Sequence, residues 1–203
     1  MPEREPDAQI VAASRSEPAR FEELFDRHFP AIHRYLARRV GSQLADDLAA
    51  ETFVQAFRIR ARYDLSRPDA RPWLLGIATN LLRHHLRDER RRLLAQARTG
   101  WGQATAPDEA ERVAERVDSR AAGPRIALAL ASLPSRDRDA LLLVAWAGLS
   151  YREAAESLGI PVGTVRSRVN RARRRVRELV GDPGQYLRED DGILPTKGGT
   201  ADG

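Results

Sequence analysis

The segment 160–180 is rich in arginine. It holds seven arginines against one glutamate, so its local charge is +6 (7 − 1). Guanidinium groups suit phosphates and guanine edges because their planar fork donates two parallel hydrogen bonds. Such a charge density on one element is typical of nucleic-acid binding. A solvated basic helix or a calmodulin-target helix would carry the same charge, so the neighbouring elements must decide between these readings.

Those neighbouring elements predict a helix-turn-helix. Ser150 and Glu153 form a capping box that begins a short helix, Gly159 ends it, and a long helix begins near Pro161. The second helix of such a motif lies in the major groove of DNA. Apolar residues at helical spacing would face the core: Val165, Val169, Ala172, Val176 and Leu179. The residues expected to contact DNA are Thr164, Arg166, Ser167, Arg168, Asn170, Arg171 and Arg174.

Two helices in the first half of the chain also carry polar faces. A helix over 43–60 has one apolar face, and a helix from Pro72 to about Arg92 has another. The acidic stripe of the first consists of Asp46, Asp47, Glu51 and Gln55. The polar face of the second consists of Asn80, Arg83, His84 and Arg87. Before both, a helical pattern runs from about 16 to 40, where Pro30 should kink or split the helix. Gly41 should end that helix and Ser42 should cap the next.

The whole pattern predicts an all-α fold, because no segment alternates as a strand does. We expect two small helical domains, 17–92 and 124–180, joined by a flexible linker over 93–123. The ends, 1–16 and the acidic 181–203, should be disordered. Because the linker holds few apolar residues, we expect the free protein to keep no fixed spacing between its domains.

Composition excludes several functional classes. The 203 residues include no cysteine, so a disulfide framework and a thiol nucleophile are impossible. No apolar run approaches the ~20 residues that span a bilayer, and the N-terminus lacks the apolar core of a signal peptide. We therefore expect a cytoplasmic protein without membrane insertion. His84 and His85 are adjacent and face different ways on a helix, and no catalytic dyad or phosphate loop is present, so we expect no enzyme, no cofactor and no metal.

The motifs resemble a known family, the extracytoplasmic-function (ECF) sigma factors of the sigma-70 family. The second domain is similar to sigma region 4 and the first to sigma region 2. The region 4 likeness rests on Leu133-Pro134-Ser135-Arg136-Asp137-Arg138, Gly148 to Ala155, and Gly159 to Arg168. The region 2 likeness rests on Asp46-Asp47-Leu48, Glu51-Thr52-Phe53, Trp73-Leu74, Ile77-Ala78, Asn80-Leu81 and His85-Leu86-Arg87.

This resemblance implies a function and partners. The protein would direct core RNA polymerase to promoters and support transcription initiation. The acidic stripe 46–55 would bind the β′ clamp helices, the 80–87 face would hold the melted −10 element, and the 164–174 residues would read the −35 element. The family also implies contact with the β flap, an anti-sigma factor as partner, and a linker that threads toward the polymerase active-site cleft. The family often has other residues where Ala50, Thr79 and His84 stand, which leaves the −10 preference open.

Two other classes remain as alternatives. A stand-alone transcriptional regulator would use the same helix-turn-helix but would not need the acidic stripe or the 80–87 face. An enzyme would need an unrecognised constellation in the linker. The presence of both domains favours the sigma factor.

Overall fold

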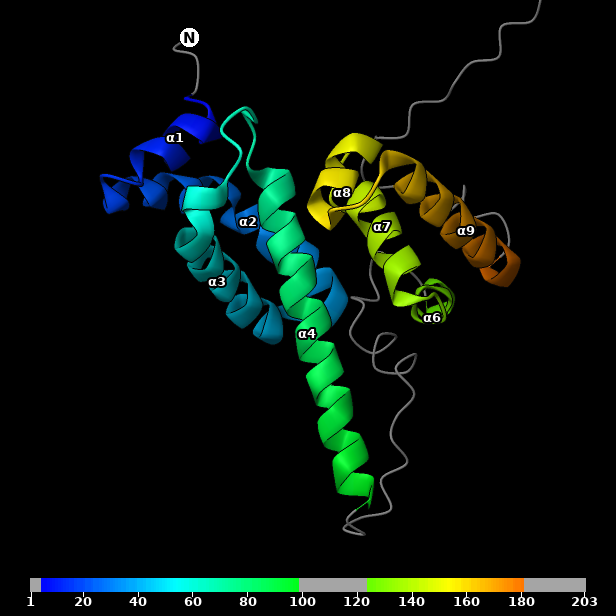
Figure 1. The fold of residues 1–203 in the computed structure, drawn as a ribbon. Helices are drawn as coiled ribbons and strands as arrows, with labels where there is room; N and C mark the ends of the chain where they lie inside the picture. The colour runs from blue at the N-terminus through cyan, green and yellow to red at the C-terminus, as the bar shows by residue number, and fades with distance from the viewer. Residues whose placement is uncertain (1–4, 99–123, 181–203) are drawn as a thin grey trace, which may run out of the picture.

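The structure, a computed structural model, describes residues 5–98 and 124–180. Every regular element in these two ranges is helical, as expected (Figure 1). The first range holds α1 (Asp7–Ala13), α2 (Phe21–Val40), α3 (Ser42–Ile59) and α4 (Arg71–Arg98), with short 3-10 turns at Pro18–Arg20 and Arg60–Arg62. The second holds α6 (Pro124–Ala131), α7 (Ser135–Ala145), α8 (Tyr151–Leu158) and α9 (Val162–Val180).

Helices α2, α3 and α4 form the first bundle. Gly41, with a φ of 80°, makes the sharp junction between α2 and α3. Gly41 itself occupies the N-cap position of α3, so the prediction that Ser42 caps this helix is wrong. Edge-on phenyl rings join α2 to α3, with Phe25 and Phe53 centroids 4.9 Å apart.

The sequence predicted that Pro30 would kink or split α2, and the split does not occur. The helix is continuous from Phe21 to Val40 with Pro30 inside it. Proline removes one backbone donor, so the carbonyl one turn earlier loses its partner. Both Pro30 and Asp26, one turn earlier, are exposed, so the lost hydrogen bond lies on the solvent side of the helix.

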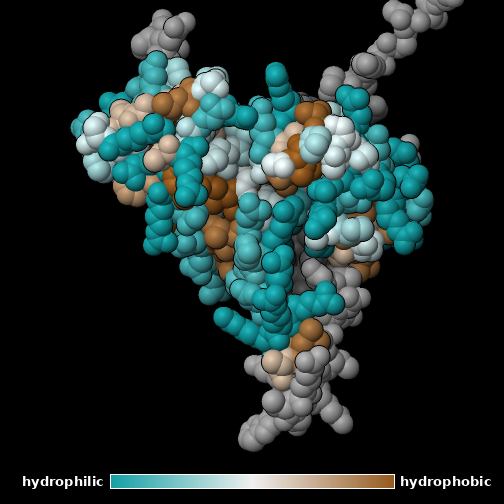
Figure 2. All heavy atoms as spheres, in the orientation of Figure 1, coloured by the Kyte–Doolittle hydropathy of each residue, from teal (hydrophilic) through white to brown (hydrophobic). Residues whose placement is uncertain are grey.

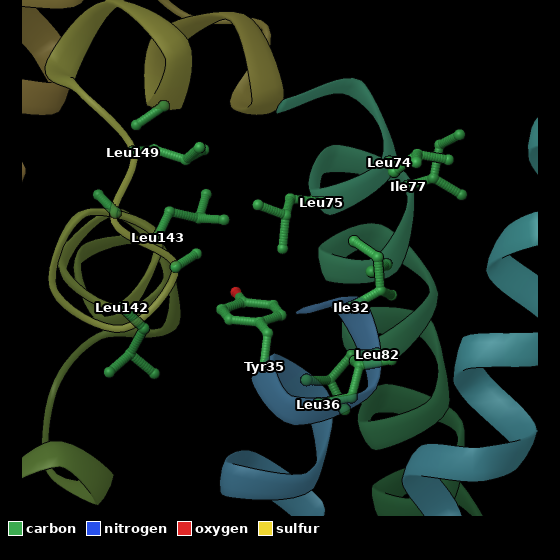
Figure 3. Packing of buried hydrophobic residues seen from close by; sticks show 14 of the residues in the cluster. Ile32, Tyr35, Leu36, Leu74, Leu75, Ile77, Leu82, Leu142, Leu143 and Leu149 are labelled. Atoms are coloured by element: carbon green, nitrogen blue, oxygen red, sulfur yellow. The ribbon is translucent and has the colours of Figure 1, made fainter. Parts of the chain in front are cut away.

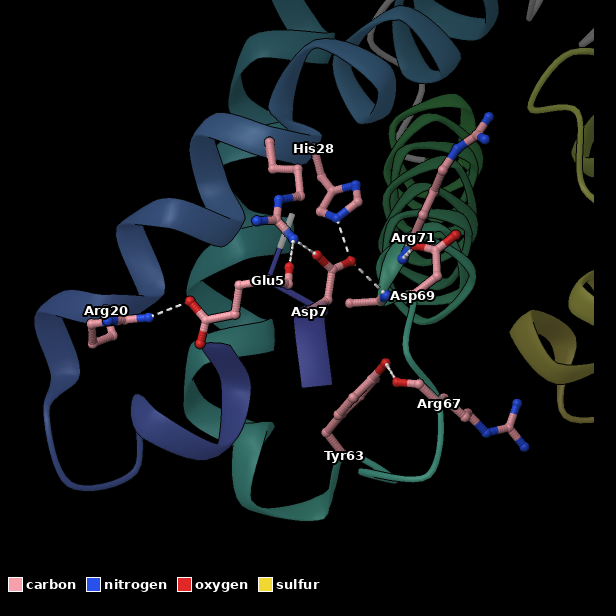
Figure 4. Close-up of polar contacts among 10 residues, drawn as sticks. Glu5, Asp7, Arg20, His28, Tyr63, Arg67, Asp69 and Arg71 are labelled. Carbon is pink, nitrogen blue, oxygen red and sulfur yellow. Dashed lines mark hydrogen bonds and ion pairs between the residues drawn. The ribbon is translucent and has the colours of Figure 1, made fainter. Parts of the chain in front are cut away.

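The N-terminal segment is ordered from residue 5, so the prediction of disorder over 1–16 is wrong for 5–16. Helix α1 buries Ile10 and Val11 completely. Asp7 fixes the helix from the other side: its carboxylate accepts hydrogen bonds from His28 Nε2 at 2.6 Å and from the Ala70 backbone N–H at 2.8 Å, and it pairs with Arg27 (Figure 4). Two apolar side chains and one buried carboxylate suffice to order a short helix that sequence composition presents as polar.

Helix α4 is longer than predicted. It runs to Arg98 rather than about Arg92, and its second half extends beyond the bundle (Figure 1). The segment 93–98, assigned to the linker from sequence, is therefore helical. The remainder of the predicted linker, 99–123, and the predicted tail, 181–203, lie outside the described residues.

The second bundle consists of the helices in the described range 124–180. Its capping box is formed, with the Glu153 backbone N–H donating to Ser150 Oγ at 3.2 Å and the Ser150 backbone N–H donating to Glu153 Oε2 at 2.7 Å. Gly159 closes α8 in the left-handed conformation, with a φ of 62°. Pro134 provides the N-cap position of α7 without a side-chain hydrogen bond, so Ser135 begins the helix rather than capping it.

The two bundles pack against each other, which contradicts the expected free spacing. Helix α4 lies between α2 and α3 on one side and α7 and α8 on the other (Figure 1). Leu75 of α4 and Tyr35 of α2 point toward Leu143 and Leu149 of the second bundle, and all four are buried (Figure 3). On the molecular face shown in Figure 2, the surface is mostly hydrophilic, and hydrophobic residues are visible between α3 and α4. Sequence reasoning missed this contact because it gave α4 only one apolar face.

Candidate nucleic-acid and polymerase interfaces

Helix α9 presents its polar residues to solvent as predicted. Val165, Val169 and Ala172 are fully buried and Val176 nearly so, which orients the helix. The candidate contact residues lie on the rest of its surface. Arg166, Ser167, Asn170, Arg171 and Arg174 are exposed, and Thr164 and Arg168 are partly buried. Leu179 was expected in the core but is 46% exposed, whereas Val176 and Val180 of the same helix pack against the core.

Arg171 differs from the other arginines of α9. Its guanidinium forms a two-pronged contact with Asp137 of α7, with Nε at 3.1 Å and Nη2 at 3.0 Å from the carboxylate oxygens. Hydrogen bonding to Asp137 raises the pKa of Arg171. By contrast, Arg166 makes no ion pair within the part of the chain that the structure describes. The guanidinium of Arg171 is therefore bound to a carboxylate of its own bundle, whereas that of Arg166 is open to solvent.

The acidic stripe lies on the outer face of α3. Asp46, Asp47 and Glu51 are exposed and Gln55 is partly buried. Asp46 contacts His33 Nε2 at 2.9 Å, and Glu51 lies 4.0 Å from Arg58. Val54, 43% exposed, lies one turn from Glu51 on the same helix. An exposed surface that combines carboxylates with an apolar side chain is complementary to a protein partner that carries basic residues.

The polar face of α4 is only partly open. Asn80, His84 and Arg87 are exposed, whereas Arg83 is partly buried. Arg83 donates from Nε to Asp139 of α7 at 2.5 Å and lies 3.4 Å from Asn80 Oδ1. The second bundle therefore covers one of the four residues that the sequence assigned to this face.

Asp139 belongs to a buried polar network that sequence reasoning missed. Its side chain is 1% exposed and accepts from Arg39 Nη2 at 2.6 Å as well as from Arg83. Arg39 also donates to the Tyr35 hydroxyl at 2.8 Å, which lies 3.0 Å from the Thr79 hydroxyl. The network thus joins α2 and α4 of the first bundle to α7 of the second.

The network keeps Arg39 charged. Burial alone would lower the pKa of its guanidinium, but the neighbouring Tyr35 and the Asp139 carboxylate outweigh burial and raise it. Burial raises the pKa of Tyr35, so its hydroxyl keeps its proton. The spacing of both charged residues carried a signal in the sequence. Arg39 lies one helical turn after Tyr35 and Leu36, and Asp139 lies one turn before Leu142 and Leu143. A charge in line with buried apolar residues indicates a buried ion pair.

Asp7, His28 and Asp69 bring three potential metal ligands within 4.8 Å of one another. Their acceptor atoms already have donors. Asp7 accepts from His28 and the Ala70 N–H and pairs with Arg27, while Asp69 accepts from the Arg71 backbone N–H at 2.8 Å (Figure 4). Burial would raise the pKa of Asp7, but these hydrogen bonds outweigh it and lower the pKa to about 2. A guanidinium at the cluster opposes a cation, so we assign it the structural role of anchoring α1.

Comparison with known proteins identifies both bundles. Residues 24–92 match the family described as Sigma-70 region 2, and residues 124–176 match Sigma-70, region 4. None of the described helices is long and apolar enough to cross a membrane.

Individual relatives agree. The chain is 34% identical over 167 residues to RNA polymerase sigma factor CarQ of Myxococcus xanthus, covering 80% of this chain and 90% of that one. It is 40% identical over 145 residues to ECF RNA polymerase sigma factor SigC of Mycobacterium tuberculosis, covering 70% and 73%. Among solved structures, CnrH in complex with the cytosolic domain of CnrY superposes with a TM-score of 0.60 at 27% identity, covering 86% of this chain and 96% of that one.

Together, the all-helical two-bundle fold and these matches define a DNA-binding transcription factor with regions 2 and 4 in one chain. The chain belongs to the sigma-70 family, as an RNA polymerase sigma factor of the ECF group.

Proposed function

We propose that three surfaces of this sigma factor bind three different targets. The acidic stripe of α3 binds the β′ clamp helices of core polymerase. The α4 face with Asn80, Arg83, His84 and Arg87 holds the unwound −10 strand. Helix α9 reads the −35 element. The observation that supports this division is the presence in one chain of regions 2 and 4, each with a polar helix face directed away from its own core.

Each surface has the chemistry for its role. Carboxylates beside the exposed Val54 fit a basic protein helix. Asn80 can hydrogen-bond a base edge, and Arg87 can hold a phosphate of the single strand. On α9, arginines with serine and asparagine between them suit the major groove, where a good arginine–guanine contact contributes about 1–3 kcal/mol of discrimination.

The protein acts without a catalytic centre of its own, and its working compartment is the cytoplasm, where polymerase is found. A contact of region 4 with the β flap and an anti-sigma partner complete the proposal. The second partner is supported by the likeness to CnrH, whose structure was solved with the cytosolic domain of CnrY. A stand-alone regulator would leave the stripe of α3 without a purpose.

Charge reversal tests the central assignment. The double variant Asp47→Lys with Glu51→Lys should lose most of its affinity for core polymerase, because like charges then meet across the interface. The matched control is Glu17→Lys with Glu22→Lys, which changes net charge equally at exposed positions away from the stripe. Core binding by fluorescence anisotropy and promoter opening by permanganate footprinting are measured on each protein.

The expected result is opening of the −10 region with wild type or control plus core, and none with the α3 variant. Wild-type protein alone should open no promoter. An α3 variant that keeps its helical circular dichroism and binds core as wild type does would contradict the assignment.

A further inference from the structure

One ion pair of the second bundle joins a buried carboxylate to an arginine on the surface of α9. Asp137 lies in the first turn of α7 and is 8% exposed, whereas the Arg171 side chain is 51% exposed. The carboxylate accepts hydrogen bonds from Nε and Nη2 of Arg171, at 3.1 and 3.0 Å. Among the residues that the structure describes, no other arginine of α9 pairs with a buried carboxylate.

The contact uses only one edge of the guanidinium. Nε–H and one N–H of Nη2 form the side edge, which Asp137 occupies. Nη1 and the second N–H of Nη2 form the end edge, which has no acceptor within the described chain. Two parallel donors of this kind match the O6 and N7 acceptors that guanine presents in the major groove. Arg171 is therefore held along one edge and open along the other.

A two-pronged base contact requires a guanidinium of fixed orientation. A free arginine side chain samples many rotamers and loses that freedom when it binds, which lowers affinity by about two- to tenfold. The two hydrogen bonds from Arg171 to a carboxylate fixed in α7 restrict the side chain before DNA arrives. Folding thus removes most of the ordering cost of the base contact.

The charge of the pair also favours a base over a phosphate. Asp137 offsets the positive charge of Arg171, so the pair as a whole attracts a phosphate only weakly. The end edge nevertheless keeps two directed donors, and the acceptor atoms of guanine carry no formal charge. Arg174 differs, because its carboxylate partner, Glu178, is exposed and lies 3.9 Å away.

We propose that Asp137 is a positioning residue for recognition of the −35 element, because it holds the side edge of Arg171 and directs the end edge toward a guanine in the major groove. Asp137 contacts no base and acts only through Arg171. This inference rests on the proposed role of α9 in reading the −35 element, and it adds a residue of the neighbouring helix that orients one reading side chain.

Two variants release Arg171. Asp137→Ala removes the carboxylate, and Asp137→Asn keeps the volume of the side chain but leaves an acceptor for only one of the two hydrogen bonds. The matched charge control is Glu178→Ala, which removes an exposed carboxylate beside Arg174 and Arg175. Val176→Ala is the stability control, because it removes buried apolar volume from α9 and leaves the ion pair intact.

Each full-length variant is assembled with core polymerase. Run-off transcription is measured on promoters that share one −10 element and differ at single positions of the −35 element. The positions read by Arg171 and Arg166 are those at which Arg171→Ala and Arg166→Ala lose the wild-type preference. Thermal unfolding is followed for each protein by circular dichroism, and all transcription assays are run well below the unfolding transition.

We expect both Asp137 variants to reduce the preference for guanine at the Arg171 position by about two- to tenfold, with Asp137→Asn the milder. Preference at the Arg166 position should be unchanged, which a general distortion of α9 would not allow. In the Arg171→Ala background, Asp137→Ala should cause no further loss, because the two residues act as one unit. Neither Glu178→Ala nor Val176→Ala should change the preference at either position.

Three results would overturn the inference. The Asp137 variants could keep the wild-type preference at the Arg171 position, or they could lose preference equally at every −35 position, which would give Asp137 a structural role alone. Arg171→Ala could also relax no position at which guanine is preferred. Failure of the proposed function has a different signature, since wild-type holoenzyme would then transcribe all −35 substitutions alike or give no transcript.

Discussion

Individual arginines of this protein differ in what they are available to bind. Arg39 is enclosed by Tyr35 and Asp139, Arg171 is held by Asp137, and Arg166 faces solvent. Arginine side chains are therefore held within the fold or left open to a partner, according to their neighbours. Such differences become measurable when one substitution changes stability and another changes binding.

The variants Arg166→Ala and Arg171→Ala should differ in this way, one changing DNA binding alone and the other also changing stability. Arg166→Ala should relax base preference at one −35 position with an unchanged melting temperature, because no ion pair within the described chain is lost. Arg171→Ala should lower the melting temperature, because it leaves the buried Asp137 carboxylate without the guanidinium that donates two hydrogen bonds to it. Thermal unfolding and a −35 substitution series measured with holoenzyme decide the matter. A melting temperature that falls equally in both variants would show that Arg171 is not the structural member of the pair.

Asp7 should contribute to stability in a pH-dependent way. Its pKa is about 2, against an ordinary value of 3.8, so Asp7→Asn should lower the free energy of unfolding at neutral pH by about 2 kcal/mol. A carboxyl whose folded pKa is depressed stabilises the fold above the unfolded value and loses that contribution as the pH falls through the folded value. The difference between wild type and variant should therefore shrink as the pH falls from about 4 toward about 2.

Urea unfolding at several pH values provides the measurement, with Asp26→Asn as an exposed carboxylate control on α2. Equal stability of wild type and Asp7→Asn at neutral pH would remove Asp7 from the contacts that hold α1.

At the scale of elements, helix ends position the surface of α9 that we propose reads the −35 element. The capping box of α8 and the left-handed Gly159 fix where α8 stops, and hence where α9 begins. Gly159 has a positive φ and open space around its Cα, so its backbone conformation, rather than crowding, disfavours other residues. The orientation of α9 then follows from its buried valines. Local hydrogen bonds thus set the geometry of the helix-turn-helix.

Ser150→Ala should lower the free energy of unfolding by about 1 kcal/mol, because it removes the side-chain acceptor at the N-cap. Glu153→Gln is the matched variant, since an amide oxygen still accepts from the Ser150 N–H. Chemical denaturation of both proteins, with duplex −35 binding measured below the unfolding transition, gives the comparison. A Ser150→Ala protein as stable as wild type would mean that water caps α8 equally well.

At the scale of the whole molecule, charge governs encounter with DNA. The chain carries 34 lysine and arginine residues against 29 aspartate and glutamate residues. This modest excess is concentrated at α9, so binding to duplex should depend steeply on salt through counterions released there. The acidic stripe of the first bundle has the opposite charge and should repel DNA.

Replacing Arg166 and Arg174 by glutamine should make the log–log dependence of duplex affinity on salt less steep by about 1.8, if each contacts one phosphate. The control is Arg58→Gln with Arg62→Gln, which removes the same charge from exposed positions of the first bundle. Affinities measured by anisotropy over a range of salt concentrations give both slopes. Equal slopes for the two double variants would show that nonlocal net charge, rather than α9, drives binding.

Sequence by itself determined the helix-turn-helix and the main helices of the two bundles, apart from α1 and the end of α4. Helical spacing of apolar residues, the Ser150–Glu153 capping box and the glycines at 41 and 159 act over a few residues, so their outcome is readable along the chain. The outward faces of α3 and α9 follow from the same periodicity. The likeness to sigma regions 2 and 4 was equally legible, since it lies in local motifs.

Only the tertiary structure decided which of these faces remain open. Arg39 and Asp139 are 100 residues apart in the chain and meet across two bundles. Helix α1 was unreadable because its order depends on Asp7 reaching His28 and Ala70, which are distant in sequence. The second buried face of α4, with Leu75 and Gly76, also becomes evident only beside α8. Local periodicity can place Arg39 and Asp139 on buried faces, but it cannot pair them, because the energy of the pairing depends on burial that the complete fold creates.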